Sequence, residues 1–386
     1  MTSRPLIYLV AGEPSGDALG GRLMLALRKR LSGDVDFAGV GGEHMTSEGL
    51  DSLFPMEELS VMGIVEILPH VPKLLGRMSQ VAGDVDRLRP DAVVTIDAPA
   101  FAHGVAKRIR QRDIPRIHYV APQLWAWRPW RVHKFRRNFN HVLALLPFEP
   151  EWFETRGVSC RFVGHPVIES GADQGDGATF RTVQAIAPDA TVLCCLLGSR
   201  RGELHRHKNS FHAAISGVAK TTPNLVCVLP TVTHLADDIR KFAADLPCRA
   251  IVVTGNDQKY AAMAASNVAL AASGTVTLEL AMAEVPTVVA YRMAFLTYAL
   301  GKPLMNVAYA NLINLILDRP VIPEFLQTQC TGENLTRALI DLLGPEGHEQ
   351  RSLVKSGLEA LGRDGTSPSD RAAEAVLEII EQSKSD

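Results

Sequence analysis

The sequence predicts an α/β protein built from two Rossmann-like domains. Short apolar runs alternate with amphipathic segments along nearly the whole chain, a pattern typical of parallel sheets covered by helices on both faces. The length of 386 residues suits two domains, and a small, polar stretch rich in Gly and Asp, residues 171–177, has the composition of a linker between them.

The first half repeats a strand, a loop and a helix. Residues 6–11 form an apolar run, followed by a Gly-containing turn and a helix over 19–31 with Leu23, Leu27 and Leu31 at helical spacing. Further strands are predicted at 37–40, 92–96, 117–120 and 141–145, with a helix over 101–111. Residues 1–170 are therefore assigned to an N-terminal domain.

The second half repeats the pattern as a C-terminal domain over residues 171–386. Its strands are predicted at 191–197, 225–229, 250–253, 268–271 and 287–290. The last helix, over about 368–382, is amphipathic and suits either domain.

Composition excludes several classes of protein. The 40 basic and 42 acidic side chains leave a net charge of −2, which argues against a global nucleic-acid-binding surface. No stretch approaches the roughly 18 consecutive apolar residues of a membrane span, and the apolar run near the N-terminus is too short for a signal-peptide core. The six cysteines form no CxxC pair and are expected to be buried thiols. A cytoplasmic enzyme is the resulting expectation.

Two loops of the N-terminal half carry candidate site residues, since ligands of such sheets lie at the carboxyl ends of strands. The turn after the first strand offers Glu13 and Ser15 beside a helix start, which suits an anion or a sugar hydroxyl. Capping of the helix by Ser15 or Asp17 is the alternative. Asp97 ends a buried strand and can act as a general base toward an attacking hydroxyl; the alternative is that it only caps the next helix.

Two loops of the C-terminal half suit a nucleotide diphosphate. In the first, Arg200 offers a planar fork of donors for phosphate oxygens, against the alternative of two solvated arginines at 200 and 201. In the second, Ser273, Gly274 and Thr275 precede a helix, and Glu279 lies about one turn further on, where a carboxylate can accept hydrogen bonds from a ribose. An ordinary capped helix is the alternative there.

Together these loops predict a donor nucleotide on one domain, an acceptor on the other, and a reaction in the cleft across which the two domains face each other. Nothing in the sequence resembles a metal cluster. The pairs Asp34/Asp36 and Asp84/Asp86 match the metal-binding DxD pattern only as dipeptide spacings and are not placed like a metal site.

Two segments predict a lipid-facing surface. Residues 61–78 carry more apolar surface than one helix face normally buries, with Val65, Ile67 and Leu68 among them. Residues 125–137 combine three tryptophans with five Lys and Arg residues and no acid, the usual composition for contact with a membrane interface and anionic headgroups. A core helix hairpin and a solvated basic face are the alternatives, and single-stranded nucleic acid is a weaker one.

An ordered series of motifs resembles the lipid-A-disaccharide synthase family, glycosyltransferases of the lipid A pathway in Gram-negative bacteria. The matching pieces lie at residues 11–17, 39–42, 58–63, 96–99, 119–122, 125–127, 146–149, 162–166, 198–200, 272–279 and 321–327. Each piece alone is weak, whereas the ordered series is specific.

The resemblance implies a GT-B fold and an inverting transfer that needs neither metal nor cofactor. The implied donor is UDP-2,3-diacylglucosamine and the implied acceptor is 2,3-diacylglucosamine 1-phosphate. The implied products are a β(1→6)-linked tetraacyl disaccharide 1-phosphate and UDP. It also implies a cytoplasmic protein bound peripherally to the inner membrane, and the sequence does not decide between a monomer and a homodimer.

Combining the loops with the resemblance gives each candidate residue a role. Asp97 is the expected base. The expected substrate contacts are Glu13, Ser15, Arg200, Ser273, Gly274, Thr275, Glu279 and, more weakly, Asn314. The expected membrane contacts are Val65, Ile67, Leu68, Trp125, Arg128, Arg131 and Arg136.

Two departures from the family pattern affect local loop geometry. The family often has proline where this chain has Leu197 and Ile313. The nearest rival function is another GT-B-type enzyme acting on UDP-N-acetylglucosamine, either a soluble-sugar transferase or a 2-epimerase. A dehydrogenase is disfavoured because GxGxxG is absent, and a non-enzymatic lipid-binding protein would leave Asp97 and the two anion loops without a purpose.

Overall fold

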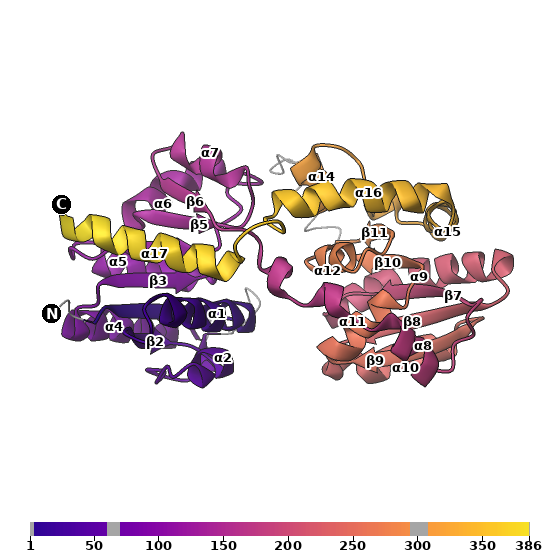
Figure 1. The fold of residues 1–386 in the computed structure, drawn as a ribbon, viewed down its shortest axis with the longest axis horizontal. Coiled ribbons are helices and arrows are strands. Elements are labelled where there is room, and N and C mark those ends of the chain that lie inside the picture. Colours follow the sequence, from indigo (N-terminus) through magenta and orange to yellow (C-terminus); the bar gives the residue numbers. More distant parts are fainter. Residues whose placement is uncertain (1–3, 60–69, 294–307, 386) are drawn as a thin grey trace. The chain divides into compact units, whose positions relative to one another are not determined.

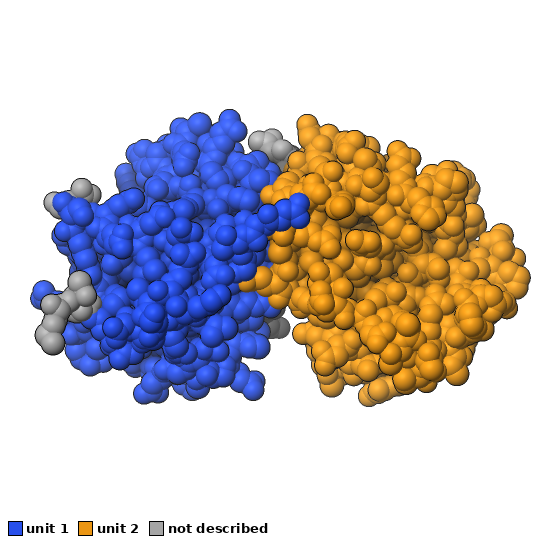
Figure 2. Space-filling model, viewed as in Figure 1, with its two compact units in different colours: residues 1–166, 364–386 blue, residues 167–363 orange. Residues whose placement is uncertain are grey.

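The computed structural model describes residues 4–59, 70–293 and 308–385 (Figure 1). The chain forms two units (Figure 2). Unit 1 comprises residues 1–166 and 364–386, and unit 2 comprises residues 167–363. The division therefore falls after Pro166, and the chain returns to unit 1 at Asp364.

Unit 1 contains a sheet of six parallel strands in the order β2-β1-β3-β4-β5-β6. The strands are β1 Leu6–Ala11, β2 Asp36–Val40, β3 Ala92–Ile96, β4 Arg116–Tyr119, β5 His141–Ala144 and β6 Ser159–Phe162. The α-helices described are α1 Pro14–Arg30, α2 Glu43–Ser47, α4 Val71–Leu88, α5 Pro99–Ile109, α6 Val132–Asn138, α7 Glu149–Glu154 and α17 Pro368–Ser385.

Both faces of this sheet are buried, as the near-continuous apolar strands predict. Successive side chains of a strand point to opposite faces. Leu9 accordingly packs with α1 and α17, whereas Tyr8 and Val10 pack with α4 and α5.

Helix α17 belongs to unit 1. Its buried face is rich in alanine, including Ala372, Ala373 and Ala375, and joins the core formed by α1 and the sheet. Arg371 donates to the carbonyl of Val163 at 2.8 Å. The last helix, which the sequence left open between the two domains, thus completes the first one.

Unit 2 contains a second sheet of six parallel strands in the order β12-β11-β10-β7-β8-β9. The strands are β7 Thr191–Leu196, β8 Leu225–Thr231, β9 Arg249–Thr254, β10 Val268–Ala272, β11 Thr287–Tyr291 and β12 Glu324–Leu326. The α-helices described are α8 Gly177–Val183, α9 Arg201–Thr221, α10 Ala236–Ala244, α11 Asn256–Ala264, α12 Val276–Met282, α14 Leu312–Leu317, α15 Gly332–Leu342 and α16 Pro345–Ala360. Helices α9, α10 and α15 pack on one face of the sheet, and α8, α11 and α12 on the other.

The predicted linker at 171–177 is packed against unit 2. A Cβ on Gly175 would lie 2.2 Å from the carbonyl oxygen of Tyr260, and Gly177 approaches Ala264 of α11 as closely as glycine allows. Asp176 caps α8 by accepting from the N–H of Thr179 at 2.9 Å. The glycines of this segment allow close packing and Asp176 caps a helix. The segment therefore has the composition of a flexible linker but is a packed part of unit 2.

Candidate active site

The topology of unit 1 brings its two candidate loops together. The first strand β1 has β2 on one side and β3 on the other, so the direction of winding changes between β1 and β3. In doubly wound sheets, ligands bind beyond the carboxyl ends of the strands at this switch point. The loop that carries Glu13 and Ser15 follows β1, and Asp97 follows β3.

These two loops are in close contact. A Cβ on Gly12 would lie 2.8 Å from the Cβ of Ala98, and a Cβ on Gly16 would lie 3.2 Å from the carbonyl oxygen of Ile96. Glycine at position 12 therefore permits the approach. Glu13 is half-buried beside this contact, and Ser15 is exposed.

Asp97 does not cap the helix that follows it. Helix α5 begins at Pro99, its capping position is Ala98, and no side chain caps it. Asp97 and Ala98 both adopt left-handed backbone conformations, with φ of 51° and 44°, which cost non-glycine residues free energy and occur often at functional sites. Burial raises the pKa of the half-buried Asp97 carboxyl, partly offset by the N–H of Ala98.

Asp17 has a structural role in the same loop. Its buried carboxylate accepts hydrogen bonds from the backbone N–H groups of Gly42, His44 and Met45, at 2.7, 2.9 and 3.1 Å. It therefore caps α2, a helix far along the sequence, whereas α1 has Glu13 at its capping position and no side-chain cap. Ser15 and Asp17 are both free of the capping role in α1 that the alternative interpretation gave them.

Unit 2 has its switch point between β7 and β10, because β7 lies between β8 and β10 in the sheet. The loop 198–200 follows β7, and the loop 273–275 follows β10. The two loops expected to hold a diphosphate thus leave neighbouring strands at one edge of the sheet. This is the edge and the position at which such sheets bind nucleotides.

Arg200 is exposed at the start of the long helix α9. Its side chain is 68% exposed, and its Nη1 lies 3.9 Å from Oε1 of Glu203. Glu203 in turn accepts from the N–H of Ser199 at 3.1 Å and packs against Gly198, whose φ of 110° favours glycine. The loop is fixed by Glu203, while the guanidinium of Arg200 remains accessible.

Arg201 points elsewhere. Its Nε lies 3.7 Å from the carboxylate of Asp238 on α10, and its side chain is 78% exposed. The two adjacent arginines therefore diverge, and Arg201 is a natural control for Arg200.

Glu279 forms an ion pair that the sequence did not predict. Lys259 of α11 lies 2.9 and 2.8 Å from the two carboxylate oxygens of Glu279, and the hydroxyl of Tyr260 donates to one of them at 3.3 Å. Lys259 sits near the N-terminus of a helix, where the helix dipole disfavours a cation. That unfavourable placement was the available signal that Lys259 has a partner.

His207 links two loops and was also missed. The buried ring accepts from the N–H of Arg292 at Nε2 (3.0 Å), so its Nδ1–H donates to the carbonyl of Leu197 (3.1 Å). Burial lowers the pKa of this histidine, which keeps it neutral. His207 thereby ties the loop of Arg200 to the end of β11. A single histidine inside a helix gives no sequence signal for such a role.

Asn314 is buried and its polar atoms are occupied within the chain. Its amide donates to the carbonyl of Ile322 and to Glu324, both at 2.7 Å, and its oxygen accepts from the N–H of Ile322 at 2.8 Å. Ile313, in place of the family's frequent proline, donates its N–H to the capping side chain of Asn311. Asn314 therefore supports the chain around Glu324.

Leu197, the other departure, is buried at the end of β7. Its carbonyl accepts the hydrogen bond from His207 described above.

The basic, Trp-rich segment is divided between core and surface. Trp125 is half-buried: its indole N–H donates to the carboxylate of Glu149 at 3.0 Å and its ring packs edge-to-face on Phe148. The exposed indoles are Trp127 and Trp130, at 49% and 59%. Trp125, one of the expected membrane contacts, is thus held by a buried acid, whereas Trp127 and Trp130 are open to the surface.

The basic side chains of this segment lie on the surface. Arg131 and Arg136 are exposed and Arg128 is half-buried, with its guanidinium 5.7 Å from the ring centroid of Trp127. Val65, Ile67 and Leu68 lie outside the described residues. Among the helices of the described ranges, none is both long and apolar enough to cross a membrane.

Glu149 is a buried carboxyl with an unusual pKa. Burial raises its pKa from 4.5 to about 7, although Trp125 and the N–H groups of Leu145 and Leu146 donate to it. The folded protein therefore keeps this proton to a higher pH than the unfolded chain does. Its stabilising contribution is complete below the unfolded pKa and is lost as pH rises through about 7.

We expect Glu149→Gln to flatten part of the pH dependence of stability. As pH rises from about 5 to about 8, the free energy of unfolding of the wild type should fall relative to the variant by about 3 kcal/mol at most. Urea unfolding at several pH values measures this difference. Glu154→Gln, at an exposed position of the same helix, is the control. A difference independent of pH would contradict the assignment.

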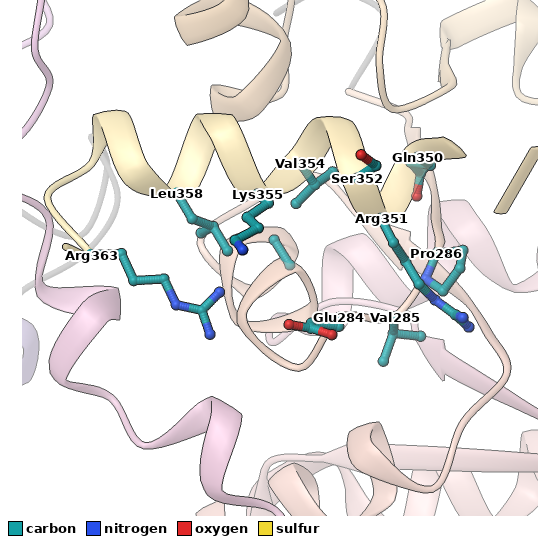
Figure 3. Close-up of a pocket in the computed structure, with 11 residues that line it drawn as sticks. Glu284, Val285, Pro286, Gln350, Arg351, Ser352, Val354, Lys355, Leu358 and Arg363 are labelled. Carbon is teal, nitrogen blue, oxygen red and sulfur yellow. The ribbon is translucent and has the colours of Figure 1, made fainter. Parts of the chain in front are cut away.

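Two further observations concern metal binding and the location of a pocket. No group of three or more His, Cys, Asp or Glu residues suited to a metal occurs in the described ranges. A pocket of about 290 Å³ in unit 2 is lined by Glu284, Arg351, Lys355 and Arg363 (Figure 3). It lies beside Pro286, just before β11 begins, so it is at the opposite edge of the sheet from the switch-point loops.

Solved structures with the same fold define the class of protein. The chain is similar to the glycotransferase of kitacinnamycin (TM-score 0.65, 18% identity, 98% of this chain and 100% of that one). It is also similar to the Neisseria meningitidis UDP-GlcNAc 2-epimerase bound to UDP-GlcNAc (TM-score 0.62, 13% identity, 98% and 99%). Two parallel six-stranded sheets with these neighbours define the GT-B fold of glycosyltransferases and related enzymes.

Sequence comparisons then identify the family. The family model described as lipid-A-disaccharide synthetase matches residues 7–376. The lipid-A-disaccharide synthase of Rhodospirillum centenum is 50% identical over 379 residues, 97% of this chain and 94% of that one. That of Paramagnetospirillum magneticum is 47% identical over 388 residues, 98% of each chain. The chain belongs to the lipid-A-disaccharide synthase family and is a glycosyltransferase that forms the lipid A disaccharide, so the rival GT-B activities are not favoured.

Proposed function

We propose that the enzyme transfers the sugar of UDP-2,3-diacylglucosamine to the 6-hydroxyl of 2,3-diacylglucosamine 1-phosphate. The products are a β(1→6)-linked tetraacyl disaccharide 1-phosphate and UDP, with inversion at the transferred carbon. The observation that carries the residue assignments is topological: the candidate residues Asp97, Arg200 and Ser273 follow strands at the switch points of the two sheets. Membership of the family supports the identity of the donor and the acceptor.

The proposed reaction is a single displacement. The carboxylate of Asp97 takes the proton of the 6-hydroxyl as its oxygen attacks the anomeric carbon of the donor, and the bond from that carbon to the diphosphate breaks. The raised pKa of Asp97 makes its carboxylate a stronger base than an exposed one. Negative charge develops on the departing UDP, where the accessible guanidinium of Arg200 stabilises it.

The remaining proposed contacts hold the substrates. The hydroxyls of Ser273 and Thr275 donate to phosphate oxygens, and Gly274 lets the diphosphate approach the backbone. Glu279 accepts from the ribose hydroxyls, held in place by its ion pair with Lys259.

Two weaker assignments concern the remaining candidate residues. Asn314, expected to contact the donor, is buried with its amide on Glu324, so we assign it the indirect role of holding Glu324 in place. Glu13 and Ser15 contact the sugar on the side of Asp97, since Gly12 brings their loop against Ala98.

Mass spectrometry of the purified protein incubated with both acylated sugars tests this function. The expected product is a disaccharide phosphate, with UDP released only when the diacylated acceptor is present. UDP release without an acceptor, or conversion of UDP-N-acetylglucosamine to its 2-epimer, would refute the proposal in favour of the rival activities.

We also propose that the protein binds the cytoplasmic face of the inner membrane peripherally, because both substrates carry acyl chains. Exposed Trp127 and Trp130 beside Arg128, Arg131 and Arg136 are the supporting observation. Each basic residue near an anionic surface contributes about 1 kcal/mol, screened within roughly 10 Å at 0.1 M salt.

We therefore expect replacement of Arg128, Arg131 and Arg136 by Ser to remove the salt-sensitive part of binding to anionic vesicles, about 100-fold in affinity at low salt. A salt-insensitive part should remain and should fall when Trp127 and Trp130 are replaced by Ser. Vesicle sedimentation at several salt concentrations measures both parts. Wild-type protein that stays in the supernatant at low salt would disprove membrane binding.

A further inference from the structure

A groove runs along helix α5 of unit 1, with α4 on one side and α6 on the other. Its volume is about 480 Å³. It extends from Ala100, in the first turn of α5, to Arg110, just past the end of that helix. Its apolar wall comes from Leu75 and Met78 of α4.

The floor of the groove depends on Gly104. A Cβ there would lie 2.2 Å from the sulfur of Met78, so only glycine lets Met78 pack against α5 in this way. Leu75 is 47% exposed beside it. An apolar strip thus lies in the open along α4, next to a row of charges.

That row consists of cations alone. The groove is lined by Lys107, Arg108, Arg110, Lys134 and Arg137. Neither α5 nor α6 carries an acidic residue. Arg108 donates to the carbonyl of Gly104 at 2.9 Å, and the other four form no ion pair within the part of the chain that the structure describes.

Acids on the neighbouring helix α4 are engaged elsewhere. Asp84 pairs with Arg87 and accepts from Tyr8, and Asp86 pairs with Arg112. The positive field also acts on His103 inside the groove: burial, together with Lys134 and Arg131, lowers the pKa of His103 to about 4. The groove therefore presents uncompensated positive charge to any ligand.

The first residue of the groove follows the proposed base closely in the sequence. Ala100 is three residues after Asp97, and Lys107 lies about 12 Å along α5 from Pro99 at 1.5 Å per residue. Long helical side chains lean toward the N-terminus of their helix, and the N-terminus of α5 is the end that follows Asp97.

We propose that this groove binds the phosphate of the acceptor, a phosphorylated amphiphilic sugar, with Lys107 and Lys134 facing the phosphate and with Leu75 and Met78 against an acyl chain. The inference rests on the proposed function for the identity of the acceptor. It adds a site for the group at the far end of the sugar from the reacting hydroxyl. Charge-assisted hydrogen bonds to phosphate supply the affinity.

The test compares two acceptors in detergent: 2,3-diacylglucosamine 1-phosphate and the same compound without its phosphate. Calorimetry measures binding of each to wild type, to Lys107→Ser/Lys134→Ser, and to the control Lys29→Ser/Lys220→Ser, which removes the same charge from exposed positions on α1 and α9. We expect the groove variant to bind the phosphorylated acceptor about 10–100-fold more weakly and the other acceptor unchanged. The control should match the wild type for both.

The groove assignment is overturned if the groove variant weakens both acceptors equally, if it weakens neither, or if it loses binding to phosphatidylglycerol vesicles while still preferring the phosphorylated acceptor. The last result would assign the groove to membrane headgroups. Because binding is measured without transfer, the two proposals fail separately. Phosphate-dependent binding without disaccharide formation by the wild type would refute the proposed function alone.

Discussion

Asp97→Asn should lower turnover by roughly 10²–10⁴-fold, the usual loss when general-base assistance is removed. Asparagine has the same shape as aspartate and tolerates the left-handed backbone that Asp97 adopts, so the β3–α5 loop should keep its conformation. It cannot take the proton of the acceptor hydroxyl. Steady-state kinetics with detergent-dispersed substrates measures the effect.

The controls separate chemistry from folding. Affinity for UDP should be unchanged, because the proposed donor contacts lie in unit 2. Asp51→Asn, which removes an exposed carboxylate from unit 1, should turn over at the wild-type rate. A folded Asp97→Asn enzyme with wild-type turnover would show that the carboxylate is not the base.

Arg200→Ala should weaken UDP binding by about 1.5–3 kcal/mol, the cost of a lost charged hydrogen bond, or roughly 10–150-fold in affinity. The guanidinium of Arg200 is accessible, and its ion pair with Glu203 is long, at 3.9 Å. Little of the folded structure therefore depends on this side chain. Calorimetric titration with UDP measures the change. Arg200→Lys should recover part of the affinity, because an ammonium keeps the charge but lacks the fork.

Arg201→Ala is the matched control. Its guanidinium lies toward Asp238 on α10, so its removal should leave UDP affinity unchanged. If both alanine variants bind UDP as tightly as the wild type does, the loop after β7 does not hold the diphosphate.

The sequence predicted the fold well because parallel strands buried on both faces read as apolar runs that loops separate. The short edge strands β6 and β12 were not predicted. Ser159–Phe162 alternates polar and apolar residues, and Glu324–Leu326 has only three. Helix α1 begins five residues before the predicted 19–31, because its first turn contains Pro14 and Gly16 in place of apolar residues. Hydrophobic periodicity detects the packing face of a helix or strand. These two strands and the first turn of α1 have little or no such periodicity.

The site was predictable only to the level of loops. The position after a strand is what nominated Asp97 in unit 1 and Arg200 in unit 2, since each sheet places such loops at the carboxyl ends of its strands; their roles remain predictions. The partners of the candidate residues on other elements could not be predicted. The pairing of Lys259 with Glu279, for example, depends on how two helices pack. Trp125 shows the same limit, because its burial depends on Glu149, a residue 24 positions later.

The return of the chain to unit 1 at Asp364 affects the order in which the protein can fold during synthesis. The ribosome releases α1 early, but the alanine-rich face that covers it belongs to α17, which is made only after the whole of unit 2. Until then, Leu23 and Leu27 of α1 lack part of their buried surroundings. Unit 2, encoded by one uninterrupted stretch, has all its strands and helices before α17 leaves the ribosome. The domain synthesised first is therefore the last to be completed, and a nascent chain stalled before residue 368 should expose the α1 surface to chaperones.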